Sequence, residues 1–328
     1  MTDKLRSTCP DCDGEMNRRD FVRVVGSTAA AAGAIPLLGS HASAAPTPKS
    51  TAETTVTQFY KTLSDEQKKA ICFPFEHELR HRISANWHVT KPEIDSDFYT
   101  DEQRKLCDDI FRGLTSEEGY DRFVKQMDYD SGGFGAYSVA VFGEPGTGKF
   151  QWLLTGRHLT ARADGDSVEN VAFGGPIVYG HGEEDTKANV FHYQTKQANE
   201  VFTALDPKQR EAALVEKAPK ESDVQLQGTS GKFPGITVSQ LSSDQRELVE
   251  KTIKVILAPY RTEDVEEALA ILKSSGGFEK LHMAFYKQAD LGNDQVWDIW
   301  RVEGPSFVWH FRGAPHVHTY ANIGTKAT

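Results

Sequence analysis

The sequence predicts an α+β protein in which helices pack on antiparallel sheet. Two observations indicate this fold class: helix-start signals recur along the chain, and two stretches alternate apolar and polar residues like β-meanders. The 328 residues are 38% hydrophobic and 26% charged, a composition typical of a soluble globular protein with a sizeable core. The 18 Phe, 10 Tyr and 5 Trp exclude a mainly disordered chain.

Charge and hydropathy exclude two further classes of protein. The net charge of −10 opposes a nucleic-acid binder, whose surface would be basic. No run of about 20 apolar residues is present, so we expect no membrane span in the mature chain.

The N-terminus is typical of an export signal. Residues 17–21 (NRRDF) hold a twin arginine, a short uncharged apolar stretch follows, and residues 42–44 (ASA) offer a cleavage site. We interpret residues 1–44 as a signal peptide read by the twin-arginine translocase, and residues 45–51 as a flexible leader. The remaining residues, 52–328, would then work in the periplasm or outside the cell.

The cysteines add little to this interpretation. Cys9 and Cys12 form a CxxC pair that would leave with the signal peptide. Cys72 and Cys107 could form one disulfide outside the cytoplasm or remain two buried thiols, and the sequence leaves both alternatives open.

Helix starts repeat one pattern in the mature chain. A Ser, Thr or Asp can cap the free backbone N–H groups, and in most cases an acid follows near the positive end of the helix dipole. The five segments with this pattern are 63–67, 99–103, 114–118, 205–209 and 241–245.

Aromatic and β-branched residues alternate with polar ones in two stretches, 136–162 and 281–320, which predicts two meanders. The expected strands are 137–142, 150–155 and 157–161, then 281–287, 296–302, 307–311 and 316–320.

The two meanders share a spacing. Trp152 precedes Gly156 by four residues, and Trp300 precedes Gly304 by four. We therefore hypothesise an internal duplication within the single domain 52–328, with pseudo-symmetric repeats 52–200 and 201–328.

Two motifs imitate known sites. Residues 143–149 (GEPGTGK) resemble a phosphate-binding loop, but Phe150 stands where Ser or Thr is required and a strand should follow, so we predict a hairpin turn. Residues 77–81 (HELRH) match the HExxH pattern of zinc proteases on a helix that would begin near Phe75. The segment is strongly charged, and an exposed helix explains it more simply.

Histidines suggest a metal site in the second meander. His316 and His318 would project from the same face of a strand. A turn after Phe311 would bring His310 beside His316, and His158 from the first meander could reach the same point. The set of His158, His310, His316 and His318 could bind one transition metal ion, with copper ranked before zinc. The alternative is that these rings pack locally beside aromatic residues.

Other residues are candidates for roles around this site. His181 lies on a Gly-rich loop with acids beside it, so it could be a ligand, a general base or a surface residue. Arg312, Tyr320 and Tyr179 are candidates for shaping a substrate site. His192, near the start of a helix, is expected to be structural.

An ordered set of motifs resembles a bacterial family, the domain-of-unknown-function family thirty-five hundred. The motifs are NWH at 86–88, LTSEEGY at 114–120, VFGEP at 141–145, the segment 152–159 ending in GRHL, GP at 304–305 and HVH at 316–318. The resemblance spans nearly the whole mature chain and implies a shared fold and site location, but no reaction. The family motif reads Gly-His-His-Leu, with an acid where His310 stands, so Arg157 and His310 mark a divergent branch. The metal site of this branch would then have more nitrogen ligands than the family's site, or it would be lost.

These patterns lead to one functional hypothesis and one alternative. The first is an exported mononuclear metalloenzyme, an oxidoreductase or hydrolase that acts on a small molecule, with catalytic candidates His181, Arg312 and Tyr320. The alternative is a non-enzymatic binding protein for a metal or a small ligand, whose groove would be lined by Trp297, Trp300 and Trp309.

Overall fold

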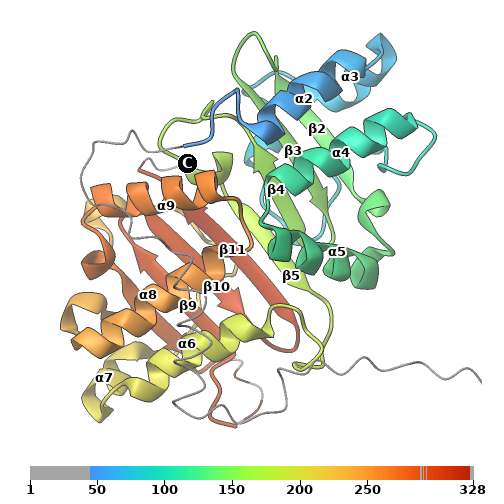
Figure 1. The fold of residues 1–328 in the computed structure, drawn as a ribbon. Coiled ribbons are helices and arrows are strands. Elements are labelled where there is room, and N and C mark those ends of the chain that lie inside the picture. The colour runs from blue at the N-terminus through green and yellow to red at the C-terminus, as the bar shows by residue number, and fades with distance from the viewer. Residues whose placement is uncertain (1–44, 289, 291, 293, 326–328) are drawn as a thin grey trace, which may run out of the picture. The chain divides into compact units, whose positions relative to one another are not determined.

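Two layers, a sheet and its covering helices, make up the described part of the chain in the computed structural model (Figure 1). The structure describes residues 45–288, 290, 292 and 294–325. The predicted export signal, its cleavage site and the Cys9–Cys12 pair lie outside these residues. The α+β class is confirmed.

The described residues form one sheet of eleven strands in the order β1-β2-β3-β4-β5-β11-β10-β9-β8-β6, with β7 paired to β8. The pairs β1–β2 and β6–β8 are parallel, and the other pairs are antiparallel. The strands are β1 (Cys72–Phe73), β2 (Ser138–Gly143), β3 (Phe150–Gly156), β4 (Leu159–Ala163), β5 (Ile177–His181), β6 (Leu214–Val215), β7 (Ile236–Thr237), β8 (His282–Tyr286), β9 (Ile299–Gly304), β10 (Phe307–Arg312) and β11 (Val317–Ile323).

Eight α-helices accompany this sheet in the described part of the chain. They are α2 (Thr51–Thr62), α3 (Asp65–Ile71), α4 (Asp101–Gly113), α5 (Glu117–Ser131), α6 (His192–Ala204), α7 (Pro207–Ala213), α8 (Ser243–Leu257) and α9 (Thr262–Ser274). None of the described helices is long and apolar enough to cross a membrane.

All five predicted helix starts are present. The capping residues are Ser64, Thr100, Ser116, Asp206 and Ser242, and each side chain accepts a backbone hydrogen bond from the first turn. Four of them form reciprocal capping boxes with a glutamine at the third helical position. Local side-chain chemistry therefore sets these boundaries.

The strands of both predicted meanders are also present, with small shifts at their ends. The predicted turn at residues 143–149 joins the hairpin β2–β3, in which Gly143 pairs with Phe150. Strand β5 was not predicted: its sequence was interpreted as a Gly-rich loop, and that interpretation is wrong, because His181 ends a fully buried strand.

The predicted helix around the HExxH match is also wrong. Residues 78–81 form a short 3-10 helix, and His77 lies before it as its cap, where its ring Nδ1 accepts a hydrogen bond from the Leu79 backbone N–H. The two histidines of the motif therefore do not share one face of an α-helix, which zinc binding in that motif requires.

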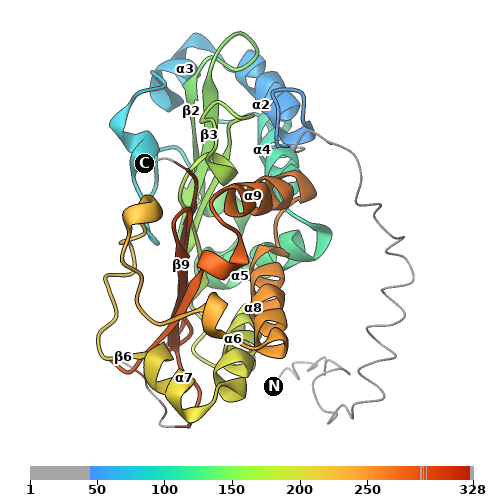
Figure 2. The same ribbon diagram turned by 90° about the vertical axis from the view of Figure 1, so that its left-hand side faces the viewer.

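Successive residues of each strand face the two sides of the sheet, and the two sides differ (Figure 2). The helix face carries the main core, including Val317, Ala321 and Ile323 of β11. The opposite face, called the loop face here, carries His318, Tyr320 and Asn322 of the same strand. Segments 73–95 and 214–235 cover it, through apolar contacts such as those of Val224.

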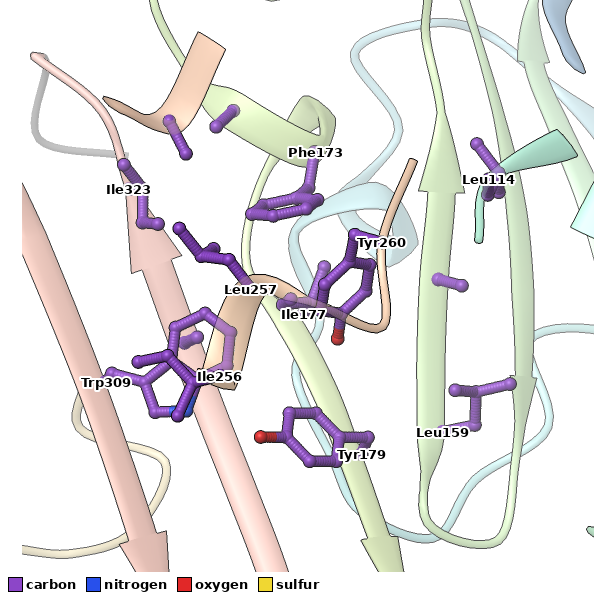
Figure 3. Packing of buried hydrophobic residues seen from close by; sticks show 14 of the residues in the cluster. Leu114, Leu159, Phe173, Ile177, Tyr179, Ile256, Leu257, Tyr260, Trp309 and Ile323 are labelled. Carbon is purple, nitrogen blue, oxygen red and sulfur yellow. The ribbon is translucent and has the colours of Figure 1, made fainter. Parts of the chain in front are cut away.

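The core of the helix face consists of large side chains from both halves of the chain. Figure 3 shows Tyr179 of β5 and Trp309 of β10 beneath Leu257, the last residue of α8, and Tyr260, which lies three residues further on. Trp300 and Trp309 are fully buried here. The predicted aromatic groove is therefore wrong for these two residues, which pack in the core and are not open to a ligand.

The duplication stays a hypothesis. One detail favours it: Gln67 and Gln103 of two capping boxes hydrogen-bond to each other, and so do Gln209 and Gln245, each 142 positions further along. The predicted boundary between residues 200 and 201 falls inside α6, so a repeat would have to begin before that helix.

At the predicted leader, residues 45–51, Pro46 is buried and α2 already begins at Thr51.

A buried acid after β4 makes stability depend on pH. Burial raises the pKa of Asp164 to about 7, and the nearby charge of Glu53 adds to the rise, although a hydrogen bond from the Val168 N–H opposes it. The unfolded chain releases this proton near pH 4, whereas the folded chain retains it up to about pH 7. The free energy of unfolding therefore falls across this window, by at most ~1.4 kcal/mol per pH unit.

We expect Asp164→Asn to remove this dependence, because the amide resembles the protonated acid. Urea unfolding measures the free energy of unfolding of both chains at about pH 5 and about pH 8. Between these pH values the variant should become more stable relative to the native chain. The matched control is Glu169→Gln, which changes an exposed acid nearby. Parallel pH profiles for Asp164→Asn and the native chain would contradict the prediction.

Candidate metal centre

Three of the four predicted histidine ligands meet on the loop face. His158 comes from the turn between β3 and β4, His316 directly precedes β11, and His318 is the second residue of β11. The Nε2 atom of His318 lies 3.0 Å from Nε2 of His158 and 3.0 Å from Nε2 of His316. One ligand atom of each ring lies within 4.8 Å of the others. We call His158, His316 and His318 the three-histidine group.

Carboxylates bind the far side of two of these rings. The Nδ1 atom of His158 lies 2.7 Å from Oδ2 of Asp130, and Nδ1 of His318 lies 2.9 Å from Oε2 of Glu221. Each carboxylate accepts a hydrogen bond, which places the ring proton on Nδ1. The lone pair of each Nε2 atom is then free to bind a cation.

This protonation pattern favours the binding of a cation between the rings. Two Nε2 lone pairs that face each other at 3.0 Å repel unless a cation lies between them. Two imidazoles bound to one tetrahedral metal ion at ~2.05 Å place their nitrogens ~3.3 Å apart, close to the spacing seen here. A carboxylate on the far nitrogen of a ligating histidine is the usual arrangement at metal sites. The geometry therefore suits a metal ion.

Asp130 is held rigidly at the end of α5. Its side chain is fully buried, its Oδ1 accepts the Gly182 N–H at 2.9 Å, and its Oδ2 accepts the Gln126 side chain at 2.8 Å. Burial alone would raise the pKa of Asp130, but the hydrogen bonds from His158, Gln126 and Gly182 lower it below its ordinary value. Asp130 is therefore ionised and holds the ring of His158 in place.

Glu221 joins the site to Arg312. Its Oε1 lies 2.7 Å from Nε of Arg312 while its Oε2 faces His318. Burial raises the pKa of Glu221, but the bond from His318 and the charge of Arg312 outweigh this effect and lower it overall. The carboxylate therefore links a ligand histidine with a cationic side chain on the neighbouring strand.

His158 is held by an unusual backbone conformation. It is the second residue of the two-residue turn between Gly156 and Leu159, with φ at 56°, in the left-handed region that non-glycine residues seldom adopt. Its N–H donates to the Ala85 carbonyl at 2.6 Å. Such strain is common at functional sites, and here it directs the ring toward β11.

The rings of β11 resist protonation. Burial and the neighbouring charges of His318 and Arg312 lower the pKa of His316 to about 4. Burial also lowers the pKa of His318, although Glu221 opposes this. Both rings are thus neutral near pH 7, which is the form that binds metal.

His310 lies outside the three-histidine group. We expected His310 to lie beside His316, and that register is wrong: His310 pairs with Tyr320, and Arg312 pairs with His318. The Nδ1 atom of His310 accepts a hydrogen bond from Nε of Arg301 at 3.3 Å. Burial and the charge of Arg301 lower the pKa of His310 to about 3.

The three predicted catalytic residues divide between the two faces of the sheet. Arg312 and Tyr320 share the loop face with His318, and the Tyr320 hydroxyl accepts a hydrogen bond from the Ala85 N–H at 3.2 Å. His181 faces the helices, where its ring contacts Tyr129 and its Nδ1 accepts the Val190 N–H. His181 is therefore not part of the three-histidine group.

Sequence reasoning missed both carboxylates. Asp130 carried a signal, because an acid in the last turn of a helix opposes the helix dipole and calls for another explanation. No sequence signal pointed to Glu221, because it lies in an irregular segment 97 residues before His318. Only the fold brings the two residues together.

The fold and the site define an α+β protein with a group of three histidines able to bind a metal ion. The chain matches the family described as "Protein of unknown function (DUF3500)" over residues 45–322, and it belongs to that family. No curated protein and no solved structure matches the chain.

Proposed function

We propose that this protein is a mononuclear metalloenzyme that acts on a small molecule outside the cytoplasm. The observation that carries the proposal is the convergence of three imidazole Nε2 atoms, two of them backed by carboxylates. His158, His316 and His318 bind one zinc or copper ion. The twin arginine in residues 17–21 supports export.

The number of ligands favours catalysis over a purely structural role. Structural zinc sites are closed by four protein ligands, whereas catalytic sites use three and leave one position for water or substrate. In the described residues the group has three candidate ligands. The side chain of His318 is 18% exposed, so the site opens to solvent. Substrate can reach the vacant position.

The neighbouring residues supply binding and orientation. Asp130 and Glu221 hold the rings of His158 and His318. Arg312, fixed by Glu221, is a cationic group beside the metal position that would attract a negatively charged part of the substrate. With zinc the bound ion would activate water for hydrolysis, and with copper it would support oxidation.

Metal analysis tests the proposal directly. Untagged protein, exported and purified without chelators, is expected to contain about one zinc or copper ion per chain by mass spectrometry. The metal found then selects hydrolytic or oxidative assays. Protein that is isolated empty, and stays empty after incubation with zinc and with copper, would overturn the metalloenzyme. A metal-loaded protein inactive in both kinds of assay would favour a non-enzymatic metal-binding protein.

The two carboxylates offer a finer test. We expect Asp130→Asn and Glu221→Gln each to weaken metal binding by ~10- to 100-fold, because the ring loses the acceptor that fixes its tautomer. Competition with a chromophoric chelator measures this change. Glu183→Gln is the control, since this nearby acid contacts none of the three histidines. Equal affinities for all three variants would contradict the assigned roles.

A further inference from the structure

A separate cavity opens on the loop face, away from the three-histidine group. Its volume is about 490 Å³, within the range of small-molecule sites. Asn322 lines it, four residues beyond His318 on β11 and thus about 13 Å along the strand. None of the three histidines lines this cavity.

Buried cations line the inner part of this cavity. Arg162 of β4 and Arg80 are 4% and 7% exposed, and Lys149 lies nearer to solvent. The acids of the lining, Glu76 and Glu169, are exposed. Glu76 lies 3.7 Å from Arg80 and offsets part of its charge, but the three cations outnumber the two acids of the lining, so the cavity is positive overall.

Arg162 is held by hydrogen bonds to carbonyl and amide oxygens and not by a direct ion pair. Its guanidinium donates to the carbonyls of Pro176 and Arg80 at 2.8 and 2.7 Å and to the Gln151 side chain at 2.8 Å. Among the described residues no carboxylate lies within ion-pair distance of it. A buried charge without a counter-ion is costly. Burial and the charge of Arg80 lower the pKa of Arg162 to about 9, although the charge of Asp164 opposes this effect.

One segment of the cavity lining has several residues with positive φ. Asp166, Asn170 and Phe173 have φ of 63°, 59° and 59°, in the left-handed region. They lie in the segment that contributes Ser167, Glu169 and Gly174 to the lining. Strained residues of this kind cluster at ligand clamps.

We propose that this cavity binds a small organic anion, whose carboxylate or phosphate lies against the guanidinium groups of Arg162 and Arg80. Arginine suits such groups because its positive charge and its N–H groups attract their oxygens. The apolar side chains of Val168, Val171 and Val224 line the space for the remainder of the ligand. This site is independent of the proposed metal site.

Calorimetric titration with four probes tests the inference: benzoate, phenyl phosphate, inorganic phosphate and the uncharged benzyl alcohol. The protein carries His318→Ala and is freed of metal, so that no anion binds through a metal ion. We expect the two aromatic anions to bind one per chain and at least ~10-fold more tightly than benzyl alcohol. Inorganic phosphate should bind more weakly than phenyl phosphate, because it leaves the apolar part empty.

Two variants locate the binding. Val168→Trp fills the cavity and should abolish it, while Lys149→Gln, an exposed change, should weaken it ~3- to 10-fold. Lys217→Gln, also exposed and outside the lining, is the control. The proposal is overturned if neither aromatic anion binds, if benzyl alcohol binds as tightly, or if inorganic phosphate matches phenyl phosphate. Unchanged binding in both Val168→Trp and Lys149→Gln would overturn it as well.

Discussion

Replacing His318 with alanine is expected to lower bound metal from about one ion per chain to less than about 0.1, because it removes the central ligand. His318 is the ring whose Nε2 lies 3.0 Å from both of the others. The two remaining imidazoles then lack the nitrogen that joins them. Affinity should fall by more than ~100-fold, beyond the effect of losing an outer carboxylate.

The matched control for this variant is His88→Ala, which removes an exposed histidine outside the group. A second variant, His158→Asn, tests the strained turn, because asparagine tolerates a positive φ but has no imidazole. Metal analysis and unfolding curves are measured on all three. We expect His158→Asn to lose metal and to lose some stability in the metal-free chain, because the buried carboxylate of Asp130 loses its bond to the ring. Full metal content in His318→Ala would place the site elsewhere.

The second large effect is expected from Arg261→Met, which should lower the free energy of unfolding by about 3–5 kcal/mol. Arg261 precedes α9 and is 7% exposed. Its two terminal nitrogens lie 2.9 and 2.7 Å from the carboxylate of Glu53 on α2, and its Nε lies 2.8 Å from Asp264.

The size of this effect follows from what the substitution leaves behind. Glu53 and Asp264 are 0% and 2% exposed, so removing the cation leaves two buried acids without a counter-charge. Burial raises the pKa of Asp264 to about 6 even with Arg261 present. The variant should therefore recover part of its stability at about pH 5, where Asp264 can take up a proton.

Urea unfolding of the native chain and the variant at two pH values measures both claims. The matched control is Lys287→Met, which breaks the exposed ion pair with Glu216, whose side chains are 49% and 76% exposed. Such a pair contributes at most about 1 kcal/mol. A loss of similar size in both variants would show that the buried cluster stabilises the fold no more than an exposed ion pair does.

Local sequence signals accounted for much of the fold. The caps at Ser64, Thr100, Ser116, Asp206 and Ser242 were predictable because a cap is a contact between residues two or three positions apart. Strands with alternating patterns were predictable for the same reason. Strand β5 is buried on both faces and lacks alternation, so its glycine and flanking acids indicated a loop.

Local sequence signals predicted only part of the histidine site. His316 and His318 were paired correctly, because residues two positions apart in an extended segment share a face. The position of His310 depended on the register between β10 and β11, and a change of register moves a side chain away from its expected neighbour. Residue types and short spacings thus indicated a histidine site, whereas the long-range pairing of strands determined which histidines meet. Asp130 and Glu221 reach the site only through the packing of distant segments, because no local pattern encodes a contact between residues 28 or 97 positions apart.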